Sequence, residues 1–333
     1  MQIRIWHVMK YMMTYSEVSL RCSPHLRICL QHSVDVLRKA ENIALRYDPD
    51  NGFWLGFSGG KDSQALYHVA QLAGVKFKAH FSPTTLDPPQ VIRFIRHHYP
   101  DVEFGKVTMS IYDMAVQKKI LPTRTMRWCC AEYKEKGGAG TVTLVGVRHA
   151  ESARRANRPE VTTASRKFGG NLDDFFAFQE KEIRKKYKNM NFDQWSIDQM
   201  QTLTCVSGKD KIIISPIIDW SDADVWEFLN HIVRVPHCEL YDPPFNKKRI
   251  GCVLCPMSNV KQKLKDCKLF PHVKHRWLEA IKRLVDNGCL SGKQKDFARL
   301  ESKDDFIEVL FQWWIDGRSW DLFIADFTHP KLF

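Results

Sequence analysis

The hexapeptide SGGKDS at residues 58–63 carries the most specific chemistry in this 333-residue chain, because it lies between an apolar run and a helical pattern. Glycines let the backbone turn tightly and approach a ligand, and the first N–H groups of a helix have no partner within it. Together with the hydroxyls and the positive end of the helix dipole, they attract an anion. The string predicts a phosphate-binding loop, although a plain Gly-Gly turn before a capped helix is the alternative. Its glycine spacing is too short for the GxxxxGK[ST] Walker loop.

A second charged segment, residues 146–155, emerges from an apolar run. Arg148 and Arg155 can each bind phosphate or sulfate through paired, charge-assisted hydrogen bonds worth roughly 1.5–3 kcal/mol. Glu151 would then position an arginine or a metal ion. The alternative is a surface loop held by an internal salt bridge.

Five of the ten cysteines have a spacing or context typical of metal ligands. Cys252 and Cys255 form a Cys-x-x-Cys knuckle before a proline. Cys129 and Cys130 are adjacent, and Cys238 precedes the knuckle. Four thiolates from these positions would suit a [4Fe–4S] cluster or zinc, and which four ligate stays open. Buried, inert thiols are expected at the other five positions: Cys22, Cys29, Cys205, Cys267 and Cys289.

Hydrophobic periodicity alternates between strand and helix along most of the chain. Strands are expected at residues 53–57, 75–81, 102–107, 141–147 and 211–215, and helices at 33–47, 62–73, 89–98, 110–118, 173–188 and 225–232. This predicts an α/β fold, a doubly wound, mainly parallel five-stranded sheet with a helical C-terminal part. Ligands bind outside the carboxyl ends of such strands, where SGGKDS, Phe81 and Gly146 would lie. Residues 156–172 are expected to form a mobile loop.

Composition indicates an enzyme with a sizeable core, since 44% of the residues are hydrophobic and 26% are charged. The predicted parts are an N-terminal extension (1–32), a nucleotide-binding domain (33–235), and a Cys-x-x-Cys segment with a helical C-terminal region (236–333). No segment approaches a transmembrane span and none has a signal-peptide core, so we expect a cytoplasmic protein with no membrane partner. The cysteine spacing fits a reducing compartment.

Most of the formal net charge of +12 falls in two segments. Residues 148–167 have a balance of +4, and residues 246–268 have a balance of +6. Charge concentrated beside candidate sites favours a polyanionic partner, either a nucleotide or a nucleic acid. A solvated, solubilising surface is the alternative.

Taken in order, the motifs resemble those of the phosphoadenosine phosphosulfate (PAPS) reductase family, part of the PP-loop ATP pyrophosphatase superfamily. The similarity covers residues 58–257. It runs through SGGKDS (58–63), Arg-Trp-Cys-Cys (127–130) with Lys134, Gly-x-Arg-x-x-Glu-Ser (146–152) with Arg155, Pro-Ile-Ile-Asp-Trp (216–220) with Asp-Val-Trp (224–226), and Arg-Ile-Gly-Cys-x-x-Cys-Pro (249–256). Several motifs in family order are a far more specific signal than any one of them.

The resemblance implies a nucleotide site and a metal centre. The nucleotide would have its adenosine end near Phe81 and Gly146 and its distal anion near Arg148 and Arg155, with Mg²⁺ offsetting the polyphosphate charge. The implied nucleotide-binding residues are Ser58, Gly59, Gly60, Lys61, Asp62, Ser63, Phe81, Gly146 and Arg148. The residues expected to act in catalysis are Lys61, Asp62, Arg148, Glu151 and Arg155. The cluster-bearing branch pairs Cys-Cys with Cys-x-x-Cys, which favours [4Fe–4S] over zinc, with ligands drawn from Cys129, Cys130, Cys238, Cys252 and Cys255.

One departure from the family pattern bears on the reaction. Reductases of this type resemble one another in a Glu-Cys-Gly-x-His segment whose cysteine attacks the sulfonyl sulfur, and no segment of this sequence matches it. Other cluster-bearing PP-loop relatives activate a substrate oxygen by adenylation and replace it with sulfur, on tRNA bases or the DNA backbone. We therefore expect a PP-loop nucleotide-dependent sulfur transferase that uses ATP or a related adenine nucleotide.

Two other functions stay open. One is assimilatory reduction of PAPS or adenylyl sulfate, and the other is a nucleic-acid-binding module with structural zinc. A sulfur donor or a thiol reductant protein is an expected partner, and homo-oligomerisation is left open.

Overall fold

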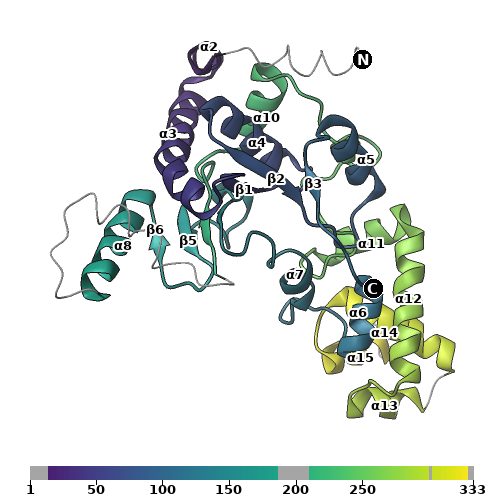
Figure 1. Ribbon diagram of the computed structural model, residues 1–333. Helices are drawn as coiled ribbons and strands as arrows, with labels where there is room; N and C mark the ends of the chain where they lie inside the picture. Colours follow the sequence, from purple (N-terminus) through teal and green to yellow (C-terminus); the bar gives the residue numbers. More distant parts are fainter. Residues whose placement is uncertain (1–13, 187–209, 300–301, 329–333) are drawn as a thin grey trace. The chain divides into compact units, whose positions relative to one another are not determined.

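The computed structural model describes residues 14–186, 210–299 and 302–328 (Figure 1). The chain divides into two compact units. Unit 1 contains residues 1–82, 90–105 and 136–250, and unit 2 contains residues 83–89, 106–135 and 251–333. Unit 2 therefore includes segments from the middle of the chain, and the domain boundaries expected at residues 32 and 235 stay a prediction. Among the described residues, no helix has both the length and the apolar character needed to cross a membrane.

Unit 1 is built around a seven-stranded sheet with the order β3-β2-β1-β4-β7-β5-β6. The strands are β1 (Phe53–Gly56), β2 (Phe77–Phe81), β3 (Glu103–Phe104), β4 (Val142–Leu144), β5 (Val161–Thr163), β6 (Gly169–Gly170) and β7 (Ile212–Ile214). The five strands that the sequence predicts are β3, β2, β1, β4 and β7, and neighbours among them are parallel. The mostly parallel sheet with its helices confirms the predicted α/β class.

Two further strands lie in residues 156–172, for which the sequence predicts a mobile loop. β5 pairs antiparallel with β7, so that Val161 is opposite Ile214 and Thr163 is opposite Ile212, and β6 pairs with β5. Val161 and Thr163 are buried. The loop prediction is wrong here because β-branched residues favour strands, and their partner β7 lies far along the chain.

The strand order reverses at β1. From β1 the chain builds β2 and β3 on one side and then returns to build β4 and β7 on the other. The loops that leave the carboxyl ends of β1 and β4 therefore flank a topological switch point, where open α/β sheets bind ligands. Residues 57–60 form the first of these loops and residues 145–148 belong to the second.

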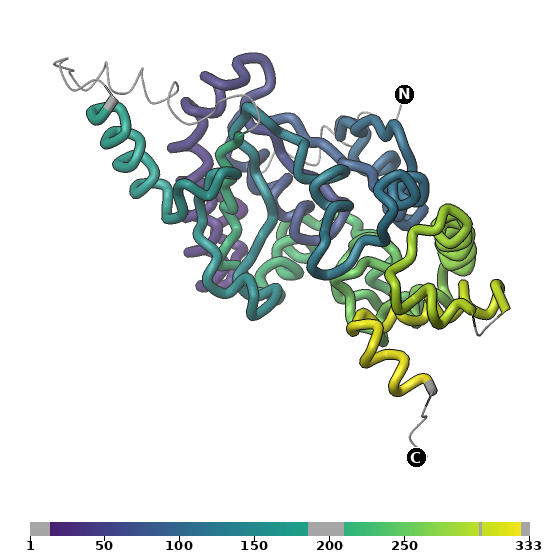
Figure 2. Tube along the Cα trace, turned by 90° about the horizontal axis from the view of Figure 1, so that it is seen from below, coloured from purple at the N-terminus to yellow at the C-terminus, as the bar shows by residue number. Residues whose placement is uncertain are grey.

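The helical elements of unit 1 are α2 (Tyr15–Arg21), α3 (Pro24–Tyr47), α4 (Lys61–Ala73), α5 (Pro89–His98), α8 (Leu172–Lys186) and α10 (Asp222–Glu227), with short turns η1 (His149–Glu151), η2 (Phe228–Ile232) and η3 (Glu239–Tyr241). α3 packs on α4, β1 and β4 through an apolar face that includes Leu26, Leu30 and Leu37. It begins at Pro24, ahead of the predicted residue 33, because proline suits the first position of a helix. α8 extends outward from the β5–β6 ribbon (Figure 1 and Figure 2).

Unit 2 is helical. Its helices are α6 (Ile111–Lys118), α7 (Trp128–Tyr133), α11 (Val260–Leu269), α12 (Pro271–Asp286), α13 (Gly292–Ala298), α14 (Lys303–Asp316) and α15 (Trp320–Thr328). Aromatic rings form its core: the ring of the buried Trp277 lies 5.0 Å from that of Tyr112 and 4.6 Å from that of Trp314. The Trp314 indole N–H donates to the Pro122 carbonyl at 2.7 Å, which ties α14 to the segment before α7.

Candidate nucleotide site and four-thiol cluster

The phosphate loop joins β1 to α4, whose first residue is Lys61. Gly59 has φ = +72°, in the left-handed region that glycine adopts without strain. The Ser58 backbone N–H donates to the Ser63 hydroxyl at 3.1 Å, and that hydroxyl donates to the Gly60 carbonyl at 2.8 Å. These bonds tie the loop to the first turn of the helix.

The loop after β4 approaches the first turn of α4 closely. A Cβ added at Gly146 would lie 2.7 Å from the Asp62 carbonyl oxygen and 3.1 Å from the Ser63 nitrogen, so only glycine fits. Phe81, at the end of β2, is buried, with its ring 5.1 Å from that of Phe104. Gly146 and Phe81 thus have packing roles, and their predicted contact with adenosine stays a prediction.

Four charged side chains form a network beside the loop. The Lys61 ammonium lies 3.1 Å from the carboxylates of both Asp62 and Asp222. The Arg148 guanidinium donates to Asp62 at 2.8 Å and to Asp222 at 2.5 Å. Its third donor group bonds the Trp220 carbonyl at 2.9 Å. Lys61 and Arg148 are both buried.

The network is electrically balanced, with two cations and two carboxylates. Burial opposes the charge of Arg148, but Asp62 and Asp222 raise its pKa. Burial likewise opposes ionisation of Asp222, but hydrogen bonds from Arg148 and Lys61 lower the pKa of that carboxyl. In this structure the donors of Arg148 serve protein acceptors, so its predicted contact with a distal anion stays a prediction.

Glu151 gathers the other arginines of the site. Its buried carboxylate accepts the Arg148 backbone N–H at 2.9 Å and pairs with the guanidinium groups of Arg155 and Arg249. The side chains of these two arginines are 30% and 48% exposed, so each can still reach a ligand. Burial and the charge of Arg155 lower the pKa of Arg158, which shows that positive charge is crowded here.

Four cysteines from two distant segments of unit 2 lie close enough to affect one another's ionisation. The hydrogen bond between Cys129 and Cys130 raises the pKa of Cys129 and lowers that of Cys130. Burial raises the pKa of Cys255, and the neighbouring Cys252 raises it further. Cys252 also raises the pKa of Lys134, so a cation lies beside the thiols.

The surroundings of the thiols suit a sulfur-ligated metal centre. The Arg127 guanidinium donates to the Cys130 sulfur at 3.4 Å. Two buried donors, Arg127 Nε and Trp128 Nε1, have no hydrogen-bond partner among the described residues, and a cluster sulfide can accept such bonds. Across the parts of the chain that the structure describes, no three Cys, His, Asp or Glu side chains are already arranged around a metal position. The donor set fits a [4Fe–4S] cluster or zinc in its chemistry.

Comparison with known proteins agrees with this geometry. The family model described as the phosphoadenosine phosphosulfate reductase domain matches residues 52–258. The chain belongs to this family. The matched span holds the phosphate loop, the arginine segment and the four interacting thiols, so the PAPS reductase-like domain is a nucleotide-binding one of the PP-loop type.

Two similar proteins are uncharacterized proteins of Methanocaldococcus jannaschii. MJ0973 is 27% identical over 237 residues, which is 68% of this chain and 47% of that protein. MJ0066 is 22% identical over 245 residues, which is 70% of this chain and 42% of that protein. The chain therefore spans less than half the length of these relatives.

Cys238 belongs to a different unit of the chain from the other four expected ligands. It is fully buried in unit 1, where burial raises its pKa, whereas the four interacting thiols belong to unit 2. Its part in a metal centre stays a prediction.

The remaining cysteines follow the expectation only in part. Cys22 and Cys29 are buried as expected, and burial raises the pKa of each to about 11. The expected burial is wrong for Cys267 and Cys289, which are half-buried because they lie on α11 and in the turn after α12. Cys205 lies outside the described residues.

The two basic segments do not form uniform basic surfaces. Three of their Lys and Arg side chains, those of Arg148, Lys247 and Lys263, are buried, and the Lys263 ammonium donates to the Ile315 carbonyl at 2.8 Å. Residues 246–268 are also divided between the two units. The exposed members can meet an anionic partner, and contact with nucleic acid stays a prediction.

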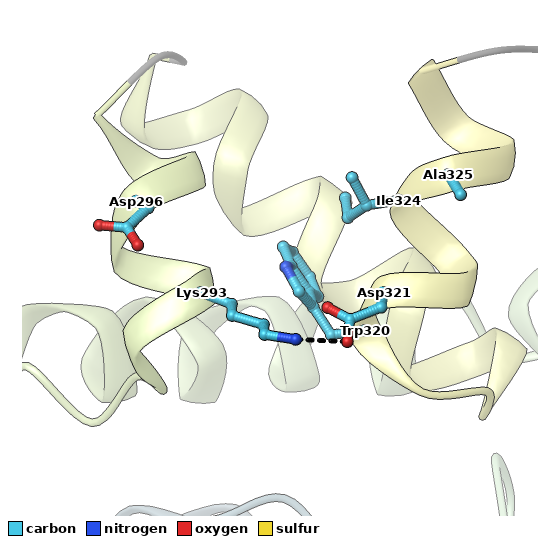
Figure 3. Close-up of a pocket in the computed structure, with 6 residues that line it drawn as sticks. All are labelled: Lys293, Asp296, Trp320, Asp321, Ile324 and Ala325. Carbon is cyan, nitrogen blue, oxygen red and sulfur yellow. Dashed lines mark hydrogen bonds and ion pairs between the residues drawn. The ribbon is translucent and has the colours of Figure 1, made fainter.

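Unit 2 also has a surface hollow of about 440 Å³ between α13 and α15 (Figure 3). An ion pair of 2.5 Å joins Lys293 to Asp321 across it. None of the predicted site residues lines this hollow, which is formed by Lys293, Asp296, Trp320, Asp321, Ile324 and Ala325.

Three residues at the nucleotide site are not among the site residues that the sequence predicts: Asp222, Tyr241 and Arg249. Asp222 has the pattern of an acidic residue in the first turn of a helix, which indicates helix capping rather than a site. Arg249 is the first residue of the Arg-Ile-Gly-Cys-x-x-Cys-Pro motif, and its place in a family motif is a signal that could have identified it as a site residue. Tyr241 carries no local signal, because its contact with the loop spans 180 residues of the chain.

Proposed function

We propose that this chain is a PP-loop enzyme that binds ATP or a related adenine nucleotide at residues 58–63 and activates an acceptor by adenylation for sulfur transfer. The observation that carries the proposal is the phosphate loop at the switch point of the sheet, in a family of nucleotide-binding domains. An acceptor oxygen would attack the α-phosphate and expel pyrophosphate. A sulfur nucleophile would then displace AMP. Mg²⁺ would offset the charge of the polyphosphate.

The charges around the loop support these roles. Lys61 and Asp62 stand at the start of α4, where the helix end favours an anion. Glu151 would orient Arg155 toward the distal phosphates, because it holds that guanidinium from a buried position. Arg148 would keep Asp62 in place. The reacting phosphate would then lie between the start of α4 and the partly exposed guanidinium groups of Arg155 and Arg249.

The thiol cluster supports the sulfur-transfer part of the proposal. We assign a [4Fe–4S] cluster to Cys129, Cys130, Cys252 and Cys255, with Cys238 as the remaining candidate ligand. Such a cluster would anchor or deliver the sulfur species. The sequence has no Glu-Cys-Gly-x-His segment to attack a sulfonyl sulfur, which favours sulfur transfer over reduction of PAPS or adenylyl sulfate. The net charge of +12 favours a nucleic-acid acceptor.

The nucleotide part is tested by calorimetric titration with ATP, adenylyl sulfate and PAPS. The double variant Asp62→Ala with Ser63→Ala should abolish binding, because it removes a carboxylate and a hydroxyl from the first turn of α4. Asp173→Ala, which alters an exposed ion pair with Lys39, is the control and should bind as the wild type does. A folded wild type that binds none of the three nucleotides would overturn the proposal. Reduction of PAPS with a thiol reductant would replace sulfur transfer by the reductase function.

A further inference from the structure

The Tyr241 hydroxyl sits at the start of the helix that follows the phosphate loop. It accepts the backbone N–H of Lys61, the first residue of α4, at 2.8 Å. A Cβ added at Gly60, the residue before the helix, would lie 3.3 Å from this oxygen. Gly60, the N-cap residue, has no side chain to cap the helix. The Tyr241 hydroxyl, from near the end of unit 1 in the sequence, caps the first N–H instead.

Packing holds the tyrosine ring in this position. The ring lies edge-on to Trp226, with centroids 5.0 Å apart, and 6.1 Å from the ring of His237. Burial raises the pKa of Tyr241, so the phenol keeps its proton at neutral pH. Within the described ranges, the phenol O–H donates no hydrogen bond, whereas its oxygen already accepts one from the Lys61 N–H. The hydroxyl is therefore a fixed donor beside the loop with its hydrogen bond still to be made.

We propose that Tyr241 is a phosphate-binding residue of the nucleotide site, which passes the hydrogen bond of the Lys61 N–H on to a phosphate oxygen. In this chain of two bonds, N–H donates to the phenol oxygen and the phenol O–H donates to the anion. Each bond polarises the next, so the phenol becomes a better donor than an isolated tyrosine. This inference rests on the proposed nucleotide binding and adds to it a residue that binds the phosphate rather than the adenosine part of the nucleotide.

The test is Tyr241→Phe, which keeps the ring packing and removes only the hydroxyl. Calorimetric titration with ATP, ADP and adenosine separates phosphate recognition from base and sugar recognition. Loss of a hydrogen bond to a charged group should weaken ATP and ADP about 10- to 100-fold and leave adenosine affinity unchanged. Tyr67→Phe is the matched control, because Tyr67 lies on α4 but donates its hydroxyl to Asp101 at 2.5 Å. Thermal unfolding of both variants checks that the fold is retained.

The other outcomes each overturn the inference in a different way. Unchanged or tighter ATP binding by Tyr241→Phe would mean that the hydroxyl is a plug displaced by phosphate. Equal weakening of ATP and adenosine would assign Tyr241 a packing role alone. If the wild type binds adenosine and ATP with equal affinity, the loop does not contribute to binding through the phosphates. If it binds none of the three ligands, the inference fails, and the titrations with adenylyl sulfate and PAPS then decide whether the proposed nucleotide binding fails as well.

Discussion

The two candidate sites differ in how their charged and reactive groups are paired. In unit 1, Lys61 and Arg148 meet the carboxylates of Asp62 and Asp222 in a balanced network. In unit 2, thiols meet thiols, and the Cys129–Cys130 hydrogen bond shifts the two pKa values in opposite directions. The cations and carboxylates of the nucleotide site thus balance one another, whereas the four thiols lie close to one another with Arg127 and Lys134 beside them. A ligand should therefore add function to unit 1, but a metal should add stability to unit 2.

The largest expected effect follows from metal removal. Binding of a metal by thiolates contributes directly to folding, on the order of 10 kcal/mol for small structural zinc sites. Protein prepared without oxygen should be brown, with absorption near roughly 400 nm and bound iron. Cys252→Ser should lose the metal and raise amide hydrogen exchange in unit 2 far more than in the sheet of unit 1.

Cys289→Ser is the matched control for that experiment, because Cys289 is a half-buried thiol of unit 2 outside the four-thiol cluster. It should keep both metal and protection. Colourless protein with stoichiometric zinc would support the structural-zinc alternative. Equal exchange in both units after metal loss would contradict the contrast between the sites. Iron content of Cys238→Ala would show whether that thiol is needed.

The next largest effect concerns the buried arginine of unit 1. Arg148→Ala should lower the free energy of unfolding by about 3 kcal/mol, because it leaves Asp62 and Asp222 with a single cation and frees the Trp220 carbonyl. Urea denaturation measures this change. Arg154→Ala removes an exposed arginine of the same segment and should change stability by less than about 0.5 kcal/mol. Similar losses for both variants would show that the network does not hold the fold.

Salt dependence compares the exposed cations of the two units. If about six phosphates are contacted, affinity for tRNA or DNA should fall by about 10³-fold between roughly 50 and 200 mM salt. Neutralising Arg154, Arg166 and Lys167 in unit 1 should lower the slope of log affinity against log salt by about 2–3. Neutralising Lys261 and Lys268 in unit 2 should lower it by about 2 if that unit also contacts the nucleic acid. A wild type without salt-dependent binding would exclude a polyanionic acceptor on these surfaces.

The smallest expected effect is a pH dependence in unit 1. His32 bonds the buried Glu160 at 2.6 Å, and this hydrogen bond raises the pKa of His32. The pKa in the folded state then exceeds the unfolded value of about 6.5, so the added stability is present below that pH and is lost as pH rises through the folded pKa. Thermal unfolding of His32→Gln should show a lower melting temperature than wild type at about pH 5.5, and this difference should shrink by about pH 9. His231→Gln, at an exposed histidine, should show no such trend.

Much of the fold follows from local patterns. The sequence predicts a helix at 62–73, and α4 occurs at Lys61–Ala73; α5 matches its predicted range of 89–98. Such elements depend on periodicity and on residues within a few positions, which the sequence displays directly. The sequence does not predict the antiparallel β5–β6 ribbon, because β5 is stabilised by pairing with the distant β7. The Arg, Ser and Gly residues around β5 are instead typical of a loop.

The sequence by itself determined the anion-binding character of residues 58–63, the alternation of strands and helices, and the pairs of thiols suited to a metal. Tertiary structure alone decided which groups meet. Asp222 reaches Lys61 across 161 residues, and Tyr241 reaches the same residue across 180. It also decided that Arg148 is buried among protein acceptors. The physical reason is that helix ends and apolar periods are local properties of the chain, whereas the partner of a buried charge depends on which strand ends the sheet brings together.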